Sequence, residues 1–118
     1  MSRRGDSAED LAAAFLERRG LKIVARNYRC RFGEIDLVAE TRAALVFVEV
    51  RARKSDEFGG PAESITAAKR RRLVATARHY HAAGGRDRPS RFDVVLLRGE
   101  PAEIEWIADA FGDDGARR

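Results

Sequence analysis

The sequence predicts a single α/β domain, in which a mixed β-sheet carries helices on both faces. Amphipathic helical segments stand before and after three strand-like segments, and a further strand follows the second helix. This order, α-β-β-β-α-β, is typical of a sheet covered by helices. The chain has 118 residues, enough to bury a core, and no internal repeat, so one domain is expected over residues 1–118.

The first helix is expected to be capped by Ser7 and to run to about Arg19. Apolar residues recur within it at helical spacing, and Gly20 follows as a terminating residue. Asp10 stands three residues after Ser7, as in a capping box in which Asp replaces Glu.

Three strands are expected next, with short connections between them. The first, Leu21–Tyr28, alternates apolar and polar residues, and a turn closed by Gly33 separates it from the second, Glu34–Ala39. The connection Glu40–Ala44 is short, which predicts an antiparallel hairpin into the third strand, Leu45–Arg51.

The segment Arg53–Pro61 is polar and rich in glycine, and we expect it to be mobile over the end of the sheet. Thr66 is the expected N-cap of a second helix that runs to about Ala83. Apolar residues at helical spacing predict its core face, which would hold Leu73, Val74, Ala77 and Tyr80.

After a loop, Phe92–Leu97 reads as the fourth strand and Ile104–Ile107 as a short fifth. The tail at residues 112–118 is expected to be disordered.

Acids inside two apolar runs are the strongest functional signal. Glu49 ends a run of β-prone residues in the third strand, and Asp36 lies within the second. Ionised carboxylates are rarely buried unless they are paired or bind a metal. Mg²⁺ (or Mn²⁺) suits a set of oxygen ligands, whereas the alternative is a structural ion pair with Arg51 or Arg53.

Side-chain alternation along a strand points Glu49 and Arg51 the same way. The hairpin brings Asp36 beside the end of the third strand, so two carboxylates and one cation are expected around one point. In metal-assisted phosphodiester hydrolysis, carboxylates hold the metal and a nearby cation stabilises the developing negative charge.

The chain carries a net charge of +4, and its charges are unevenly distributed. Ten basic residues and only four acids lie between Arg18 and Lys54. This balance suits a polyanionic partner, although a solvated basic surface with no partner is the alternative. The cations that we expect to contact nucleic acid are Arg53, Lys54, Lys69, Arg70 and Arg72.

No apolar stretch approaches the length of a membrane-spanning helix, and the N-terminal residues do not resemble a signal peptide. Cys30 is the single cysteine, so no internal disulfide forms. A cytoplasmic location without a membrane partner is the expectation.

Several motifs stand at intervals along the chain: Gly33–Ala39, Phe47–Arg51, Phe58–Gly59 with Pro61 and Glu63, Lys69, and Arg91–Val95. Together they resemble the YraN-like family, over roughly residues 8 to 111. That family is regarded as a distant branch of the PD-(D/E)XK nuclease superfamily, similar to archaeal Holliday-junction resolvases. The resemblance implies a restriction-endonuclease-like αβββαβ core.

The resemblance also implies roles for four residues. Asp36 and Glu49 match the motif acids, Arg51 stands at the motif lysine, and Glu9 matches a helix glutamate that completes the metal shell. In this chain Ala8 replaces the glycine that commonly precedes that glutamate. Arg51 keeps the positive charge of the lysine, but a guanidinium does not give up its proton and so cannot act as a base.

Three functions remain open at this point. The first is a Mg²⁺-dependent endonuclease acting on branched or otherwise structured DNA, for which the resemblance to resolvases implies a homodimer. The second is a nucleic-acid-binding module that keeps the fold without catalysis. The third is a structural or interaction protein. The acids at positions 36 and 49 favour the first over the second, and the basic balance favours either over the third.

Overall fold

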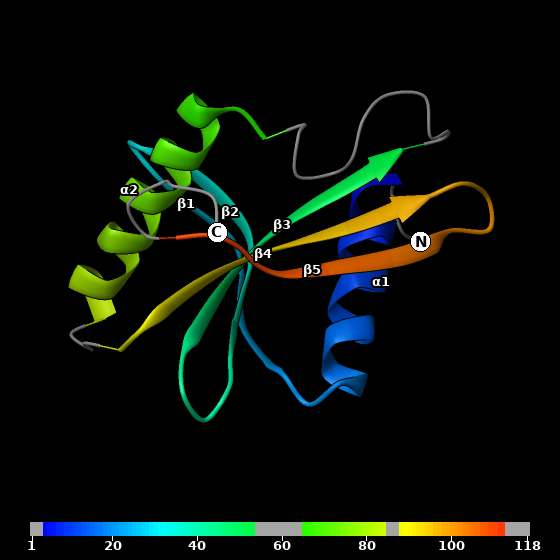
Figure 1. Ribbon diagram of the computed structural model, residues 1–118, viewed down its shortest axis with the longest axis horizontal. Coiled ribbons are helices and arrows are strands. Elements are labelled where there is room, and N and C mark those ends of the chain that lie inside the picture. Colours follow the sequence, from blue (N-terminus) through cyan, green and yellow to red (C-terminus); the bar gives the residue numbers. More distant parts are fainter. Residues whose placement is uncertain (1–3, 54–64, 85–87, 113–118) are drawn as a thin grey trace.

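The computed structural model describes residues 4–53, 65–84 and 88–112, with side chains from residue 8 onward. Its elements follow the predicted order, with a fifth strand at the end (Figure 1). Their bounds are α1 Arg4–Arg18, β1 Lys22–Cys30, β2 Gly33–Glu40, β3 Leu45–Arg53, α2 Ala67–Gly84, β4 Ser90–Arg98 and β5 Glu103–Phe111.

The five strands form one mixed sheet in the order β1-β2-β3-β4-β5. In the described part, β3 and β4 run parallel, and the other neighbouring strands are antiparallel. Parallel neighbours need a crossover connection, and α2 lies within it. The predicted mixed sheet is therefore confirmed.

Two apolar clusters fill opposite faces of the sheet. Leu73, Val74 and Ala77 of α2 pack on one face, in a cluster centred on Phe47 and Phe92. Ala12, Ala13 and Leu16 of α1 belong to a second cluster, whose strand residues are Leu37, Ala39, Val46, Val48, Val95 and Leu97. Figure 1 shows the two helices on opposite sides of the sheet, so the predicted placement of helices on both faces is confirmed.

The two helix starts differ in how well they were predicted. Helix α2 begins one residue after Thr66, whose Oγ1 accepts a hydrogen bond from the Lys69 backbone N–H at 3.0 Å, so this cap is confirmed. Helix α1 begins at Arg4, so the predicted cap at Ser7 is wrong because Ser7 lies inside the helix. No proline between Arg4 and Ser7 stops the helix from extending by this extra turn. Most of Arg53–Pro61 and the tail from residue 113 lie outside the described residues.

Strand β5 is longer than predicted because a buried carboxylate secures its far end to β4. Asp93 is 1% exposed and accepts the backbone N–H of Asp109 at 2.9 Å, where the strand register shifts. The same carboxylate binds the Arg91 guanidinium at 3.0 and 2.9 Å and the Trp106 indole N–H at 2.8 Å. Asp93 is thus fully engaged in joining β4 to β5.

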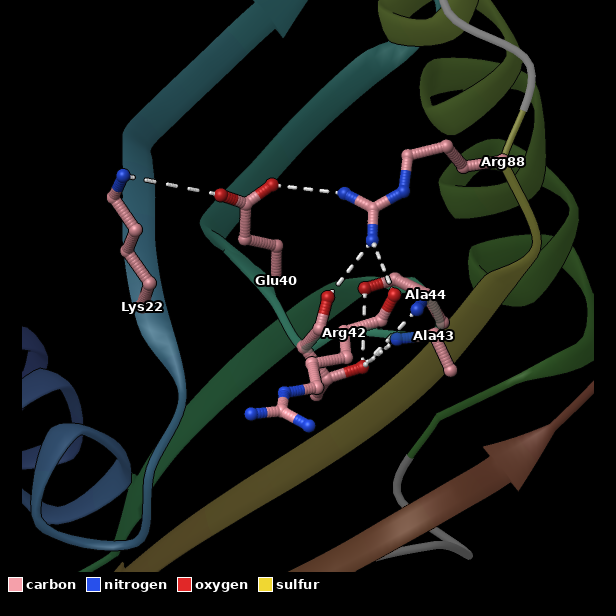
Figure 2. Close-up of polar contacts among 7 residues, drawn as sticks. Lys22, Glu40, Arg42, Ala43, Ala44 and Arg88 are labelled. Carbon is pink, nitrogen blue, oxygen red and sulfur yellow. Dashed lines mark hydrogen bonds and ion pairs between the residues drawn. The ribbon is translucent and has the colours of Figure 1, made fainter.

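Arg88 fixes the turn between β2 and β3 against the start of β4 (Figure 2). Its guanidinium donates to Glu40 Oε2 and to the Thr41 carbonyl, each at 2.8 Å. The Leu45 N–H donates to the Pro89 carbonyl at 2.9 Å, next to the register pair of Leu45 with Ser90. These contacts set the parallel register at one end of β3 and leave the other end for the site.

Candidate active site

The predicted acids lie at a fork in the sheet, where β2 and β3 separate. Pairing between these strands ends at Leu37 opposite Val48. Beyond this point β2 continues to pair with β1 as far as Gly33, and β3 continues with β4 as far as Arg53. The fork leaves backbone groups of β3 without a β2 partner, so side chains can take their place.

Asp36 occupies this fork. Its Oδ2 accepts the backbone N–H of Val50 at 2.8 Å, a bond from the side chain of β2 to the backbone of β3 just beyond their last ladder pair. The carboxylate is thereby held beside the end of β3, as the hairpin predicted.

Glu49 is 6% exposed, on the α2 face of β3. Its Oε2 lies 3.3 Å from Arg51 Nη1 and 3.2 Å from Lys69 Nζ. The Arg51 contact confirms that Glu49 and Arg51 point the same way, and it is also the ion pair given above as the structural alternative. A buried carboxylate is costly unless it is paired, and these two cations supply the pairing.

Lys69 is the residue of this site whose position the sequence did not reveal. It was predicted as a nucleic-acid contact, but its ammonium reaches Glu49 from the first turn of α2. The signal was available in the topology, because a crossover after a parallel strand starts near the carboxyl end of that strand. An amine therefore stands where Arg51 alone was expected.

A small pocket of about 90 Å³ brings these groups together. Asp36 and Glu49 line it with Lys69 and Arg72, and its remaining lining residues are Gly33, Glu34 and Leu73. The pocket thus joins three carboxylates to two cations from α2. Glu34 is also ion-paired with Arg29 at 3.2 Å, as expected for an acid near a strand start.

Glu9 stands at the edge of this arrangement. Its Oε1 accepts a hydrogen bond from Asn27 Nδ2 at 3.1 Å, and it does not line the pocket. Its charge nevertheless acts on Asp36 and contributes to the raised pKa of that carboxyl. Within the described residues, no group of three or more His, Cys, Asp or Glu side chains is placed to hold one metal ion.

Burial is the main cause that raises the pKa of Asp36 to about 7 from an ordinary value of 3.8. The negative charge of Glu49 raises this pKa further, with smaller contributions from Glu9 and Glu34, and the Val50 hydrogen bond lowers it. Asp36 therefore resists ionisation in a site where another carboxylate is already buried. A divalent cation would relieve that repulsion, and the oxygen donors present fit Mg²⁺ or Mn²⁺.

The predicted nucleic-acid contacts separate into different positions. Lys69 and Arg72 lie at the pocket, and Arg53 ends β3 beyond it. Arg70 instead donates to the Ile65 carbonyl at 2.7 Å, so its guanidinium also secures the start of its own helix. Lys54 lies outside the described residues.

The fold and the pocket together define a mixed α/β protein with an acidic site at a strand fork, compatible with a restriction-endonuclease-like core. The sequence profile of the Uncharacterised protein family UPF0102 matches residues 8–97. The chain belongs to that family, which agrees with the resemblance to the YraN-like proteins.

Relatives align over nearly the whole chain. A UPF0102 protein of Nitrosomonas europaea is 56% identical over 111 residues, covering 93% of this chain and 94% of the relative. One of Methylobacillus flagellatus is 54% identical over 112 residues, covering 94% and 98%. One of Cupriavidus taiwanensis is 56% identical over 114 residues, covering 96% and 86%. No helix in the described part of the chain is long and apolar enough to cross a membrane.

Proposed function

We propose that this protein is a metal-dependent endonuclease that hydrolyses phosphodiester bonds in branched or otherwise structured DNA. The observation that carries the proposal is the pocket at the fork. There, Asp36 and Glu49 face cations delivered by β3 and α2. Opposite charges placed so closely suit a reaction in which acids hold a metal and cations meet a phosphate.

Asp36 and Glu49 would hold Mg²⁺ or Mn²⁺. Glu9 is near enough for its negative charge to act on Asp36, and so to add to the attraction for the ion. When bound, the ion supplies a water of lowered pKa and polarises the phosphoryl oxygen. Arg51 and Lys69 neutralise the negative charge that develops on the phosphate oxygens. The Lys69 ammonium can also donate a hydrogen bond that orients a water.

The test is cleavage of a panel of DNA substrates by the full chain in Mg²⁺ or Mn²⁺. The panel contains four-way junctions, flaps, duplexes and single strands, with EDTA as the metal-free arm. Metal-dependent cutting of at least one branched or structured substrate is expected. Cutting that persists in EDTA would contradict the metal-dependent mechanism.

Lys69→Met is expected to lower the cleavage rate by roughly a hundredfold or more, because it removes one preorganised cation from the transition state. Arg51→Lys is expected to keep most of the rate, since the charge remains. Single-turnover rates at saturating enzyme separate this effect from binding. Lys22→Met is the matched control. Lys22 Nζ also lies near a sheet glutamate, 4.0 Å from Glu40 Oε1, but at the end of β2 away from the pocket. Full activity in Lys69→Met would remove Lys69 from the mechanism.

Nucleic-acid affinity is expected to fall steeply with salt, because the cations at the site displace counterions from the phosphates. If Arg53, Lys69 and Arg72 each neutralise one phosphate, duplex affinity should fall roughly 40-fold between about 50 and 200 mM salt. Fluorescence anisotropy measures this slope. Arg72→Ala should make the slope shallower by about 0.9. Arg42→Ala, an exposed residue in the β2–β3 turn, should leave it unchanged.

A non-catalytic nucleic-acid-binding module is the second candidate. The observation that favours it is the pairing of Glu49 with both Arg51 and Lys69, which already balances a buried charge without a metal. Binding across the whole panel, with no cleavage in either metal, would select this function over the enzyme.

A further inference from the structure

The turn between β1 and β2 places an exposed aromatic ring beside the pocket. Cys30 pairs with Gly33 across the hairpin, so Arg31 and Phe32 form a two-residue tip. Phe32 is 38% exposed, although large apolar side chains are usually covered. Gly33, the next residue, lines the pocket that contains Asp36 and Glu49.

This tip is seated firmly against α2. A Cβ added at Gly33 would lie 3.3 Å from Thr76 Oγ1, tighter than most contacts, and the backbone there has a φ of +150° that favours glycine. The Phe32 N–H donates to Cys30 Sγ at 3.4 Å. The backbone that carries Phe32 is therefore held by a short turn of the fold and does not belong to a long loop.

Two groups contact the Phe32 ring. The His79 ring of α2 lies edge-on to it, with centroids 6.3 Å apart, and the Arg31 guanidinium carbon lies 4.9 Å from its centre. The Tyr28 hydroxyl holds His79 by a hydrogen bond to Nδ1 at 2.5 Å. Tyr28 in turn packs against Tyr80, at 5.0 Å between centroids. His79 is thus held in place on the side of the ring that faces α2.

A comparison with another arginine–aromatic pair in the described part of the chain shows what is unusual here. The Arg19 guanidinium carbon lies 3.5 Å from the centre of the Phe15 ring, and Arg19 Nη1 donates to the Phe15 carbonyl at 3.3 Å. Phe15 packs against Trp106 on its edge. In that pair, Arg19 lies directly against Phe15, and Trp106 packs against the same ring. Arg31 instead lies further from its ring, and the Phe32 ring is exposed.

The same helix face connects the tip to the site. Lys69, Arg72, Thr76 and His79 follow one another at spacings of three and four residues, which places them along one stripe of α2. From Arg72 at the pocket to His79 at the tip, the helix rises about 10 Å. This rise equals about three nucleotide steps of a stacked strand.

We propose that Phe32, Arg31 and His79 form a stacking platform for an unpaired base of the nucleic acid whose phosphates lie at the pocket. Aromatic rings and arginine planes both stack bases that have left a duplex. The arginines at the tip and at the pocket match the charge of a phosphate backbone. The inference rests on the proposed function and gives its substrate class, a nucleic acid with a single-stranded segment within a few nucleotides of the phosphate at the pocket.

Binding of oligonucleotides that contain 2-aminopurine tests the platform, in Ca²⁺ or EDTA so that nothing is cut. The wild type should bind a single strand, or a duplex with unpaired bases, more tightly than a perfect duplex, and should quench the fluorophore. Phe32→Ala should weaken single-strand binding roughly 5- to 150-fold, which corresponds to about 1–3 kcal/mol, and should leave duplex binding unchanged.

Matched variants separate stacking from folding. Phe32→Leu keeps an apolar side chain without a π-system and should lose affinity as Phe32→Ala does, whereas Phe32→Trp should keep or increase it. Leu11→Ala, which truncates a residue of α1 that is 47% exposed, should change nothing. Thermal unfolding confirms that the variants fold.

Two negative results have different meanings. A wild type that binds no nucleic acid at low salt overturns the proposed function together with the platform. A wild type that binds and cleaves, but whose single-strand affinity and quenching are unchanged in Phe32→Ala and Phe32→Leu, overturns the platform alone.

Discussion

Asp36→Asn and Glu49→Gln are each expected to lower Mg²⁺-dependent cleavage by more than about a hundredfold, while nucleic-acid binding stays equal or becomes tighter. Each change removes one charged oxygen ligand from the proposed metal site, and metal ions contribute several kcal/mol of transition-state stabilisation. Each change also removes a negative charge that repels the phosphate backbone. Single-turnover cleavage and anisotropy, measured on the same preparations, report the two effects separately.

Glu105→Gln is the matched control for these two variants. Glu105 is an acid of β5 paired with Arg98 at 2.7 Å, and its removal should leave cleavage unchanged. Cleavage that survives in both Asp36→Asn and Glu49→Gln would remove the pocket from the mechanism. A parallel loss of binding and cleavage would instead assign the two acids to substrate positioning.

The second large effect concerns stability in the metal-free protein. Asp36 has a pKa of about 7 in the folded chain and 3.8 as its ordinary value, so the folded state binds more protons than the unfolded state between these limits. Stability therefore decreases as pH rises from about 4 to about 7, and the penalty is fully present above that window. Asp36→Asn removes the penalty and should be more stable than the wild type at pH 8 by on the order of 2–4 kcal/mol.

Denaturant unfolding of both proteins in EDTA at pH 4 and pH 8 measures this difference. The stability advantage of Asp36→Asn should be small at pH 4 and reach its full value at pH 8. In Glu49→Gln, which keeps Asp36, the pKa of Asp36 should be lower because the neighbouring negative charge is gone. The decrease in stability should therefore be complete at a lower pH than in the wild type. Asp10→Asn, which changes an exposed acid of α1 paired with Arg26, should alter stability by no more than about 1 kcal/mol. An advantage that is the same at both pH values would contradict the assignment to Asp36.

The sequence predicted the fold because local and global signals agreed. The apolar run into Glu49 marked the third strand, and the Thr66 cap marked the start of α2 to within one residue. The same run identified Glu49 as an anomaly, and strand alternation placed Arg51 beside it. These features depend on a few adjacent residues, which is why they can be read without a structure.

The parts that escaped prediction depend on distant contacts. Lys69 meets Glu49 only because α2 returns across the sheet, and no local pattern encodes that meeting. The fork between β2 and β3 forms because β2 stays paired with β1, and β3 with β4, beyond the point where β2 and β3 stop pairing with each other. The length of β5 depends on the Asp93 carboxylate, which is bonded across strands to Trp106 and Asp109.

The crossover through α2 also determines when the site can assemble during synthesis. Asp36 and Glu49 belong to one hairpin, whose short loop closes at little entropic cost. Lys69 arrives on a helix that follows both acids in the chain and packs against β2 and β1. A nascent chain that stops short of α2 therefore carries both acids without the lysine. The complete constellation forms only after α2 has followed the hairpin out of the ribosome.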